Sequence, residues 1–478
     1  VTKPTDKLWL SYTMGSGSDT ATPCELMDRI ADMFGDVSIK TDIEEESAST
    51  APSAYSALIK HLRTGVENGH IDARAGELYA ALHKDREDAR KLASLPSSWI
   101  PSVSAEPLGE DAAHRLYGAR LSGGITSIEK FNGCPFKHFA SVGLKLTPRK
   151  EYRERKADEG LFCHEAMSLL TKELIAMGKG DGSITNDQLE TLLDSVLPKL
   201  IAQHNNGVLM DTARGRAAAA RLIRRVKATA YAVVEQLRRG EFGISGTEVE
   251  FGTGKRYPEL ILELPGGGRY ILSGRIDRID SYTSDSGERF VRVIDYKSKS
   301  GSAFDCADIA DGKRLQLPLY IAAIEAAGAA ERAAGMYYLP VHEGIINSSG
   351  KEDDFGARIL KEFRLRGACL NDAKLIELGG GEDVQPTARS GWRLSEEQLK
   401  GTVNFAVDRA RQTAYKIAKG YAQAYPLIDK RGYDECSMCD YNSVCGFDAT
   451  LPCCKYRRAS IIKKDDFLEE VSHAQLDR

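Results

Sequence analysis

Residues 274–280 read GRIDRID and residues 293–297 read VIDYK, and these two stretches decide the fold. Both alternate apolar and polar residues, which is typical of strands that bury one face. The segment between them contains TSDSGE, a run of turn-forming residues, so we expect the two strands to form a hairpin. Because residues i and i+2 of a strand share a face, Asp295 and Lys297 project together, and Asp277 can converge on them from the first strand.

Two carboxylates beside a lysine suit metal-dependent hydrolysis of a phosphodiester. A hard cation such as Mg²⁺ prefers oxygen ligands, polarises a phosphoryl oxygen and lowers the pKa of bound water. Lys297 could orient or deprotonate the attacking water and stabilise charge on the phosphate. His164 lies in an amphipathic segment, residues 160–174, that we expect to be helical, and it could add a ligand.

The pattern D-x-K alone is weak support for a catalytic site. Charged side chains usually lie in water, so most isolated pairs of this kind decorate an exposed sheet face. Here the surroundings favour a site, because Asp295 follows an apolar strand segment. In addition, Gln316 and Tyr320 follow as Q-x3-Y on an expected helix, residues 315–327. By the same standard, His164 alone would be an ordinary core or surface histidine.

The hairpin belongs to a longer α/β pattern. A β-rich block begins at residue 246 and is preceded by an expected long helix, residues 208–240. After the helix at 315–327 we expect a strand over residues 334–341 and a long helix over residues 395–420. Residues 342–395 between them carry no clear periodicity and are expected to be irregular.

We expect two domains, residues 1–120 and 121–478. The first has a strand-like stretch at 8–14 and helical patterns at 25–34 and 75–95. A loop rich in Pro and Ser then leads toward the boundary.

The second domain starts with ITSIEKF, residues 125–131. This is a capping-box pattern in which Thr126 or Ser127 caps a helix that begins at Glu129 or Lys130.

Composition excludes several classes of protein. The chain has 65 basic and 69 acidic residues, so its overall charge does not indicate a polyanionic partner. A local basic patch would nevertheless suffice for phosphate contacts. No apolar run approaches the roughly 18 residues of a membrane helix, and no signal peptide pattern begins the chain, so we expect a cytoplasmic protein without membrane attachment. The first residue is Val1, so we expect a fragment of a longer chain. No phosphate-binding loop G-x4-G-K-[ST] occurs, so we expect no ATPase activity.

Cysteines form a second signal near the C-terminus. Cys436, Cys439 and Cys445 have the spacing C-x2-C-x5-C, and Cys134 is the candidate for a fourth ligand. C-x2-C is half of either a zinc site or an iron–sulfur site, and the spacing by itself leaves both open. The other six cysteines are scattered, as expected of free thiols in a reducing compartment.

The order His164, Asp277, Asp295-x-Lys297 and Gln316-x3-Tyr320 resembles the RecB-type branch of the PD-(D/E)XK nucleases. The resemblance implies a restriction-endonuclease-like core with a mixed central sheet and flanking helices. It further implies that the histidine and the two aspartates bind Mg²⁺, or alternatively Mn²⁺. The lysine would be catalytic, and the Gln/Tyr pair would support the site and the DNA.

Two glutamates precede the hairpin, and the motif leaves them open. Glu248 and Glu250 lie on the expected strand before it, and either is a candidate for a further acidic ligand.

With FNGCPF at residues 131–136, the cysteine set resembles that of the AddB (RexB) subunits of bacterial helicase–nucleases. The resemblance covers nearly the whole chain and implies that Cys134, Cys436, Cys439 and Cys445 hold a [4Fe–4S] cluster that clasps the nuclease domain. Residues 1–120 would be the remnant of a helicase-like region. The implied partners are an AddA-type helicase–nuclease subunit and the single-stranded ends of unwound DNA, with cleavage of the 5′-ended strand during recombinational repair.

Two other functions stay open. One is a stand-alone iron–sulfur nuclease of the CRISPR-adaptation type, although such nucleases are close to the size of the nuclease core alone. The other is a DNA-binding or scaffold module without catalysis, against which the complete His/Asp/Asp/Lys set argues.

Overall fold

The structure, a computed structural model, describes residues 10, 15–16, 19–20, 22, 24–34, 50–99, 106–149, 151–152, 155–298, 304–328, 331–344, 355–389, 392–451 and 453–473. By its internal contacts the chain divides into two compact units, Val1–Ile100 and Pro101–Arg478. This division precedes the expected boundary near residue 120, because α5 (Glu110–Tyr117) contacts elements of the second unit. The helicase-like character of residues 1–120 stays a prediction, and the strand expected at 8–14 lies outside the described residues except for Leu10.

The first unit is helical over most of its described length. Its helices pack around a small core that includes Leu58, Leu78 and Leu92. The single helix expected at 75–95 is two helices, because the Asp85 carboxylate accepts the backbone N–H groups of residues 87 and 88 and starts a new helix. The described elements are β1 (Gly15–Ser16), β2 (Asp19–Thr20), α1 (Glu25–Met33), α2 (Ala51–Asn68), α3 (Ala73–Leu82) and α4 (Arg86–Trp99).

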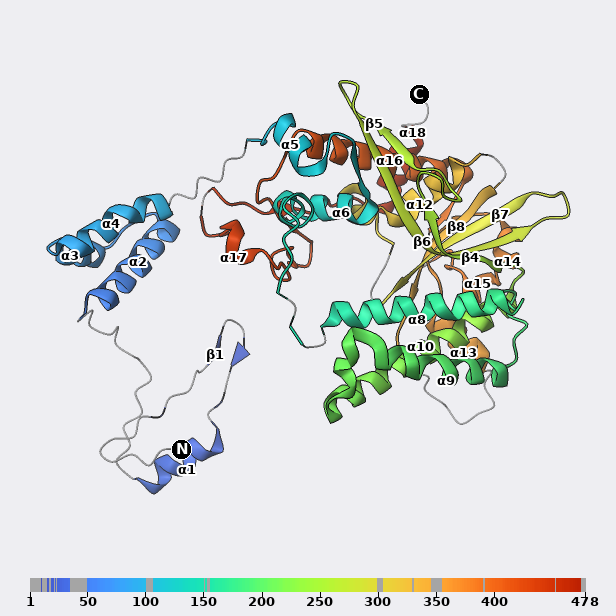
Figure 1. Ribbon diagram of the computed structural model, residues 1–478, viewed down its shortest axis with the longest axis horizontal. Coiled ribbons are helices and arrows are strands. Elements are labelled where there is room, and N and C mark those ends of the chain that lie inside the picture. The colour runs from blue at the N-terminus through green and yellow to red at the C-terminus, as the bar shows by residue number, and fades with distance from the viewer. Residues whose placement is uncertain are drawn as a thin grey trace. The chain divides into compact units, whose positions relative to one another are not determined.

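The second unit is built on a mixed sheet, which has eight strands within the described residues (Figure 1). The order is β10-β9-β8-β7-β6-β3, and β4 and β5 also pair with β6. β7 pairs antiparallel with β6 and parallel with β8, as expected for a hairpin followed by a helical crossover. The bounds are β3 (Leu121–Gly124), β4 (Gly243–Phe251), β5 (Leu260–Glu263), β6 (Arg269–Thr283), β7 (Arg289–Lys297), β8 (Glu331–Pro340), β9 (Arg366–Leu370) and β10 (Trp392–Leu394).

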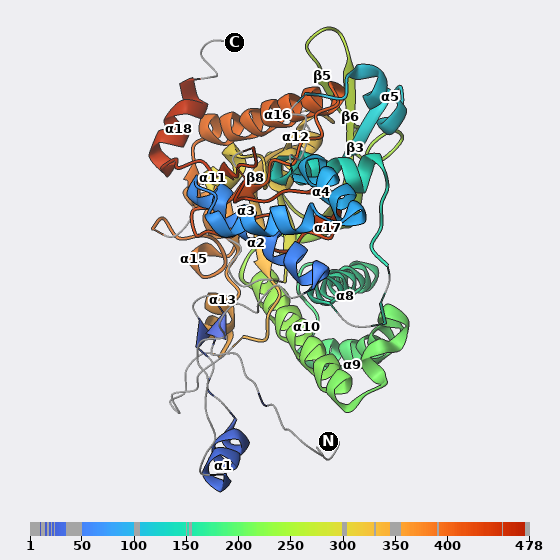
Figure 2. The same cartoon turned by 90° about the vertical axis from the view of Figure 1, so that its left-hand side faces the viewer.

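Helices cover both faces of this sheet, so the predicted α/β class with a mixed central sheet and flanking helices is confirmed. Val291 and Val293 of β7 face one core, which α6, α12, α16 and α18 complete. Ile294 and Tyr296 face the other core, which α8, α9, α10 and α13 complete. Figures 1 and 2 both show α12 and α16 on one side of the strands and α8 to α10 on the other. The bounds are α6 (Ile125–Gly133), α8 (Lys156–Ala176), α9 (Asn186–Gln203), α10 (Ala213–Arg239), α12 (Gln316–Glu325), α13 (Phe355–Glu362), α16 (Glu396–Ala418) and α18 (Lys464–His473).

Two local expectations are wrong. Residues 342–395 are not irregular throughout, since they contain α13, β9, α14 (Ala373–Leu378), α15 (Gly381–Val384) and β10. Each of these elements is only three to eight residues long, so its own periodicity is weak. The expected capping box at 125–131 is also absent: α6 starts at Ile125 with Gly124 before it, and no side chain caps it.

Candidate active site and cysteine clasp

The hairpin places two carboxylates side by side at the carboxyl end of β7. Arg278 of β6 lies opposite Ile294 of β7, so Asp277 and Asp295 are the next residues on the two adjacent strands. The side chain of Asp277 is 14% exposed and that of Asp295 is 2% exposed. Two carboxylates that are adjacent and largely shielded from water repel each other strongly, so positively charged groups are needed beside them.

Lys297 is one of these partners. Its Nζ atom forms an ion pair with Asp295 Oδ2 at 2.5 Å and donates a hydrogen bond to Gln316 Oε1 at 2.9 Å. The ammonium also lies 5.3 Å from the centre of the Tyr338 ring, over its face. The predicted neighbours Asp295, Lys297 and Gln316 are therefore brought together.

His164 is the other partner, and α8 supplies it. Its Nδ1 atom lies 3.0 Å from Asp277 Oδ2, which also accepts the backbone N–H of Tyr296 at 3.1 Å. Burial disfavours the imidazolium of His164, but the hydrogen bond and charge of Asp277 outweigh this and raise its pKa. One turn earlier, Gly160 allows α8 to approach β7, because a Cβ atom there would lie 3.3 Å from Ser298 Oγ.

Asp295 carries the clearest electrostatic signature. Burial, together with the neighbouring Asp277 carboxylate, raises its pKa to about 6, against the opposing effect of Lys297. Asp295 Oδ2 is paired with the Lys297 ammonium. A cation bound beside the two carboxylates would further favour their ionised forms, and these oxygen donors are of the kind that a hard divalent ion prefers.

The side chains are nevertheless held by protein partners in this structure. Within the described ranges, no three His, Cys, Asp or Glu side chains are arranged so that they could hold a metal ion. Ligation by Asp277, Asp295 and His164 would therefore require them to turn from the contacts described above.

The remaining predicted residues fall into two groups. Tyr320 is buried on α12 near Asp295 and Asp277, and its pKa is raised by burial and by these carboxylates. Glu248 and Glu250 instead pair with Arg275 and Lys255, each at 2.5 Å.

Two further residues lie beside the site, although the sequence predicted no role there for either of them. Tyr338 is opposite Asp295 in the β7–β8 register. Glu129 is expected to begin its own helix, but its Oε1 atom accepts the backbone N–H groups of Leu315 and Gln316 at 2.7 and 3.1 Å. A parallel strand pairing could have indicated Tyr338, whereas Glu129 has no local signal because its partners are remote in sequence.

The second half of GRIDRID has a different role. Asp280 is fully buried and accepts hydrogen bonds from Arg278, at 2.6 and 2.8 Å, and from Arg292 at 2.9 Å. Burial disfavours its charge, but the two guanidinium groups outweigh this and lower its pKa. This buried ion triad belongs to the sheet and not to the set of residues predicted to be catalytic.

The C-terminal segment docks onto the start of the second unit. Lys137 Nζ lies 3.1 Å from Glu435 Oε2, the Phe136 N–H donates to Gln423 O at 3.0 Å, and the Tyr441 hydroxyl donates to Leu146 O at 2.9 Å. In Figure 1 the blue-green segment around α6 and the red segment around α17 (Asn442–Cys445) lie on the same side of the sheet. Two parts of the chain that are about 300 residues apart are thus joined.

The four predicted cysteines lie on the two segments that this joint connects. The thiol of Cys436 interacts electrostatically with those of Cys134, Cys445 and Cys439. Burial raises the pKa of Cys134, while burial, Asp434 and the other thiols raise the pKa of Cys436 to about 12. A cationic centre bound to these thiols would favour the thiolates and lower these pKa values. Among the described residues the cysteines are not arranged as a group that could hold a metal ion, so ligation would require the thiols to turn toward one another.

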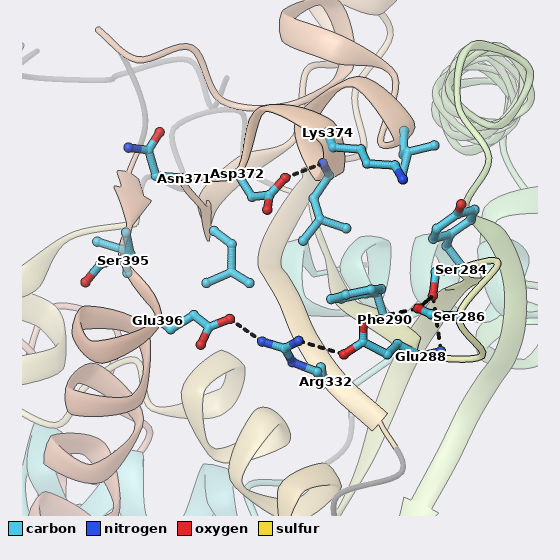
Figure 3. Close-up of a pocket in the computed structure, with 15 residues that line it drawn as sticks. Ser284, Ser286, Glu288, Phe290, Arg332, Asn371, Asp372, Lys374, Ser395 and Glu396 are labelled. Atoms are coloured by element: carbon cyan, nitrogen blue, oxygen red, sulfur yellow. Dashed lines mark hydrogen bonds and ion pairs between the residues drawn. The ribbon is translucent and has the colours of Figure 1, made fainter.

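A separate cavity of about 390 Å³ lies at the other end of β7 (Figure 3). There Arg332 points between Glu288, at 3.0 Å, and Glu396. Phe290 lines this cavity and lies seven positions before Lys297, roughly 23 Å along the strand. The cavity is therefore not part of the carboxylate site.

The fold and the site define a nuclease of the PD-(D/E)XK type. The chain belongs to the PD-(D/E)XK nuclease superfamily, whose family model matches residues 124–446. This range contains each predicted metal-site residue and each predicted cysteine ligand.

More particular relatives are each named as the B subunit of an ATP-dependent helicase/deoxyribonuclease. The chain is 26% identical to the protein from Alkaliphilus metalliredigens, over 98% of this chain and 43% of the relative. It is 30% identical to the Moorella thermoacetica protein, over 96% of this chain and 42% of the relative. It is 27% identical to the protein from Clostridium botulinum strain Loch Maree, over 100% of this chain and 44% of the relative. The predicted resemblance to the AddB subunits is confirmed, and the chain spans less than half the length of these relatives.

Proposed function

We propose that this chain is the nuclease part of an AddB-type subunit, and that it cleaves single-stranded ends of unwound DNA with Mg²⁺, or alternatively Mn²⁺. The observation that carries the proposal is the convergence of His164, Asp277, Asp295 and Lys297 at the end of β7. Membership of the PD-(D/E)XK superfamily supports the reaction class, and the name of the relatives supports a role beside a helicase.

Each residue has a role that its surroundings support. Asp277 and Asp295, with His164, would hold the metal, which polarises the scissile phosphate and lowers the pKa of a bound water. Lys297 is steered by Gln316, so its ammonium can hold the attacking water or donate to a phosphate oxygen. Tyr320 is buried on α12 near the two carboxylates and would support the site from that helix.

The wider assignment follows the relatives. We propose that Cys134, Cys436, Cys439 and Cys445 bind a [4Fe–4S] cluster, and that an AddA-type subunit is the partner. The complex would resect double-strand ends in the cytoplasm and would use this chain for the 5′-ended strand. Of the described helices, none is long and apolar enough to cross a bilayer.

The test is cleavage of forked DNA labelled on either strand, with the chain alone and with an AddA-type partner. Asp295→Asn should slow cleavage by at least about 100-fold in Mg²⁺, because it removes a charged ligand. Asp285→Asn, in the exposed turn of the same hairpin, is the matched control and should cleave at the wild-type rate. EDTA should stop the reaction, and the products should come from the 5′-ended strand.

Two outcomes would count against the proposal. Cleavage by Asp295→Asn at the wild-type rate would remove the site from the reaction. Tight binding of the fork without cleavage in Mg²⁺ or Mn²⁺, by wild type with its partner, would favour the scaffold alternative.

A further inference from the structure

The start of α12 is held by a side chain from another helix. Leu315, the residue before this helix, offers no side-chain cap. The Glu129 carboxylate supplies one, because its Oε1 atom accepts the N–H groups of Leu315 and Gln316 at 2.7 and 3.1 Å. A negative group at this end also complements the dipole of the helix.

The residue fixed in this way is the one that holds the lysine. Gln316 is the first residue of α12, and its Oε1 atom accepts a hydrogen bond from Lys297 Nζ at 2.9 Å. We infer that Glu129 is a positioning residue for Lys297, acting through the backbone and side chain of Gln316. The inference rests on the proposed nuclease function.

The helix that carries Glu129 is well placed to act as a brace. Asn132, one turn later on α6, donates to Gly312 O at 3.0 Å and accepts from the Thr413 hydroxyl at 2.9 Å. These contacts tie α6 both to the turn before α12 and to α16. Glu129 is itself half-buried, and burial raises its pKa to about 7 against the opposing pull of the two N–H groups and of Lys297.

Keeping Glu129 ionised at this position costs electrostatic free energy, which argues for a structural role of its carboxylate. Glu129 lies near Asp295, and the negative charge of Asp295 raises the pKa of Glu129 further. A carboxylate that is disfavoured by both burial and a like charge is retained here in contact with two backbone donors.

A set of variants separates position from charge. Single-turnover cleavage in Mg²⁺ is compared for Glu129→Gln, Glu129→Asp and Glu129→Ala. The amide oxygen of Gln reaches the same two N–H groups, so this variant should stay within about threefold of wild type. The Asp side chain keeps the charge but is one methylene shorter and does not reach the two N–H groups. Glu129→Asp and Glu129→Ala should therefore both cleave more slowly than wild type, on the order of 10- to 100-fold. A role of charge alone predicts the reverse order, with Asp active and Gln slow, and would overturn the inference.

The path through Gln316 is tested by a double variant. If Glu129 acts through Gln316, then Glu129→Ala combined with Gln316→Ala should be no slower than Gln316→Ala alone. DNA affinity, measured in Ca²⁺ for each variant, should be unchanged. Additive losses, or a loss of affinity in place of rate, would contradict the inference.

Hydrogen exchange supplies a readout that needs no activity. The amides of residues 315–320 should exchange faster in Glu129→Ala but not in Glu129→Gln. Glu325→Ala, at the other end of α12, is the matched control and should leave these amides unchanged. If wild type does not cleave DNA, the proposed function fails while exchange still tests the brace. If wild type cleaves but the Ala and Asp variants match it in rate and exchange, only the brace fails.

Discussion

The Asp295 side chain concentrates the physical conflict of the site. It is nearly inaccessible to water and it lies beside a second carboxylate, and the Lys297 ammonium is its paired cation. A buried carboxylate of this kind costs folding free energy whenever it is ionised. Such a cost is typical of functional sites, where a ligand removes it.

This conflict predicts how stability depends on pH in the metal-free protein. The pKa of Asp295 in the folded state is about 6, above its ordinary value of 3.8. The folded state therefore binds this proton more tightly than the unfolded state does. The resulting stabilisation of the fold is fully present below pH 3.8 and is lost as the pH rises through 6. Asp295→Asn carries no such proton. The free energy of unfolding of the variant should therefore rise relative to that of wild type by about 2 kcal/mol between pH 4 and pH 7.

Urea unfolding in EDTA at several pH values measures this difference. Asp285→Asn should show no comparable trend, because that side chain lies in an exposed turn. Mg²⁺ at pH 7 should then stabilise wild type more than Asp295→Asn. A difference between variant and wild type that is independent of pH would contradict the environment described for this carboxylate.

At the scale of elements, close packing of α8 against β7 sets the position of His164. Gly160 leaves room for this approach, and a Cβ atom there would meet the Ser298 hydroxyl at 3.3 Å. An alanine can be accepted if the exposed Ser298 side chain turns away. A branched side chain would bring further atoms toward Ser298, so we expect it to displace the helix.

Gly160→Val should therefore slow Mg²⁺-dependent cleavage by on the order of tenfold or more, since small displacements of catalytic groups are costly. Leu161→Val is the matched control, because it places the same residue at the next, exposed position of α8. Rate constants and thermal unfolding are measured for both. Equal rates for the two valine variants would show that the approach of α8 does not matter.

The sequence predicted the hairpin, the crossover helix and the following strand because their periodicity is local and strong. The sequence also predicted that Asp277, Asp295 and Lys297 lie close together, since strand alternation determines which residues share a face. It failed for Glu129, where a pattern typical of a local cap is used to cap another helix. It failed over residues 342–395, where short strands at the sheet edge are defined by pairing and not by their own pattern.

At the scale of the whole second unit, the chain closes on itself where its C-terminal segment docks onto the segment that follows α6. Lys137 pairs with Glu435 and the Tyr441 hydroxyl donates to Leu146 O, and the four cysteines of the proposed cluster lie on these two segments. Closing so long a loop removes conformational entropy from the unfolded chain, and the contribution of a cross-link grows with loop length. A metal centre here would therefore stabilise the unit as well as join it.

Cys436→Ser should lower bound iron and sulfide together and remove the absorption band near 400 nm expected of a [4Fe–4S] centre. Limited proteolysis should then cut the C-terminal segment before the sheet. Cys306→Ser is a matched control, because Cys306 is a buried thiol outside the clasp. About one zinc per chain, without iron, would instead indicate a zinc staple and reduce the proposed iron–sulfur clasp to an analogy.

The most direct test of a nuclease site at the end of β7 is single-turnover cleavage by Lys297→Ala. Wild type, Lys297→Ala and Lys255→Ala are compared in Mg²⁺, using preparations that contain equal amounts of bound iron per chain. Lys255→Ala is the control, because it removes an exposed lysine that pairs with Glu250. The site predicts a loss of at least about 100-fold for Lys297→Ala, with unchanged DNA affinity, and wild-type rates for Lys255→Ala. Cleavage by Lys297→Ala at the wild-type rate would contradict it.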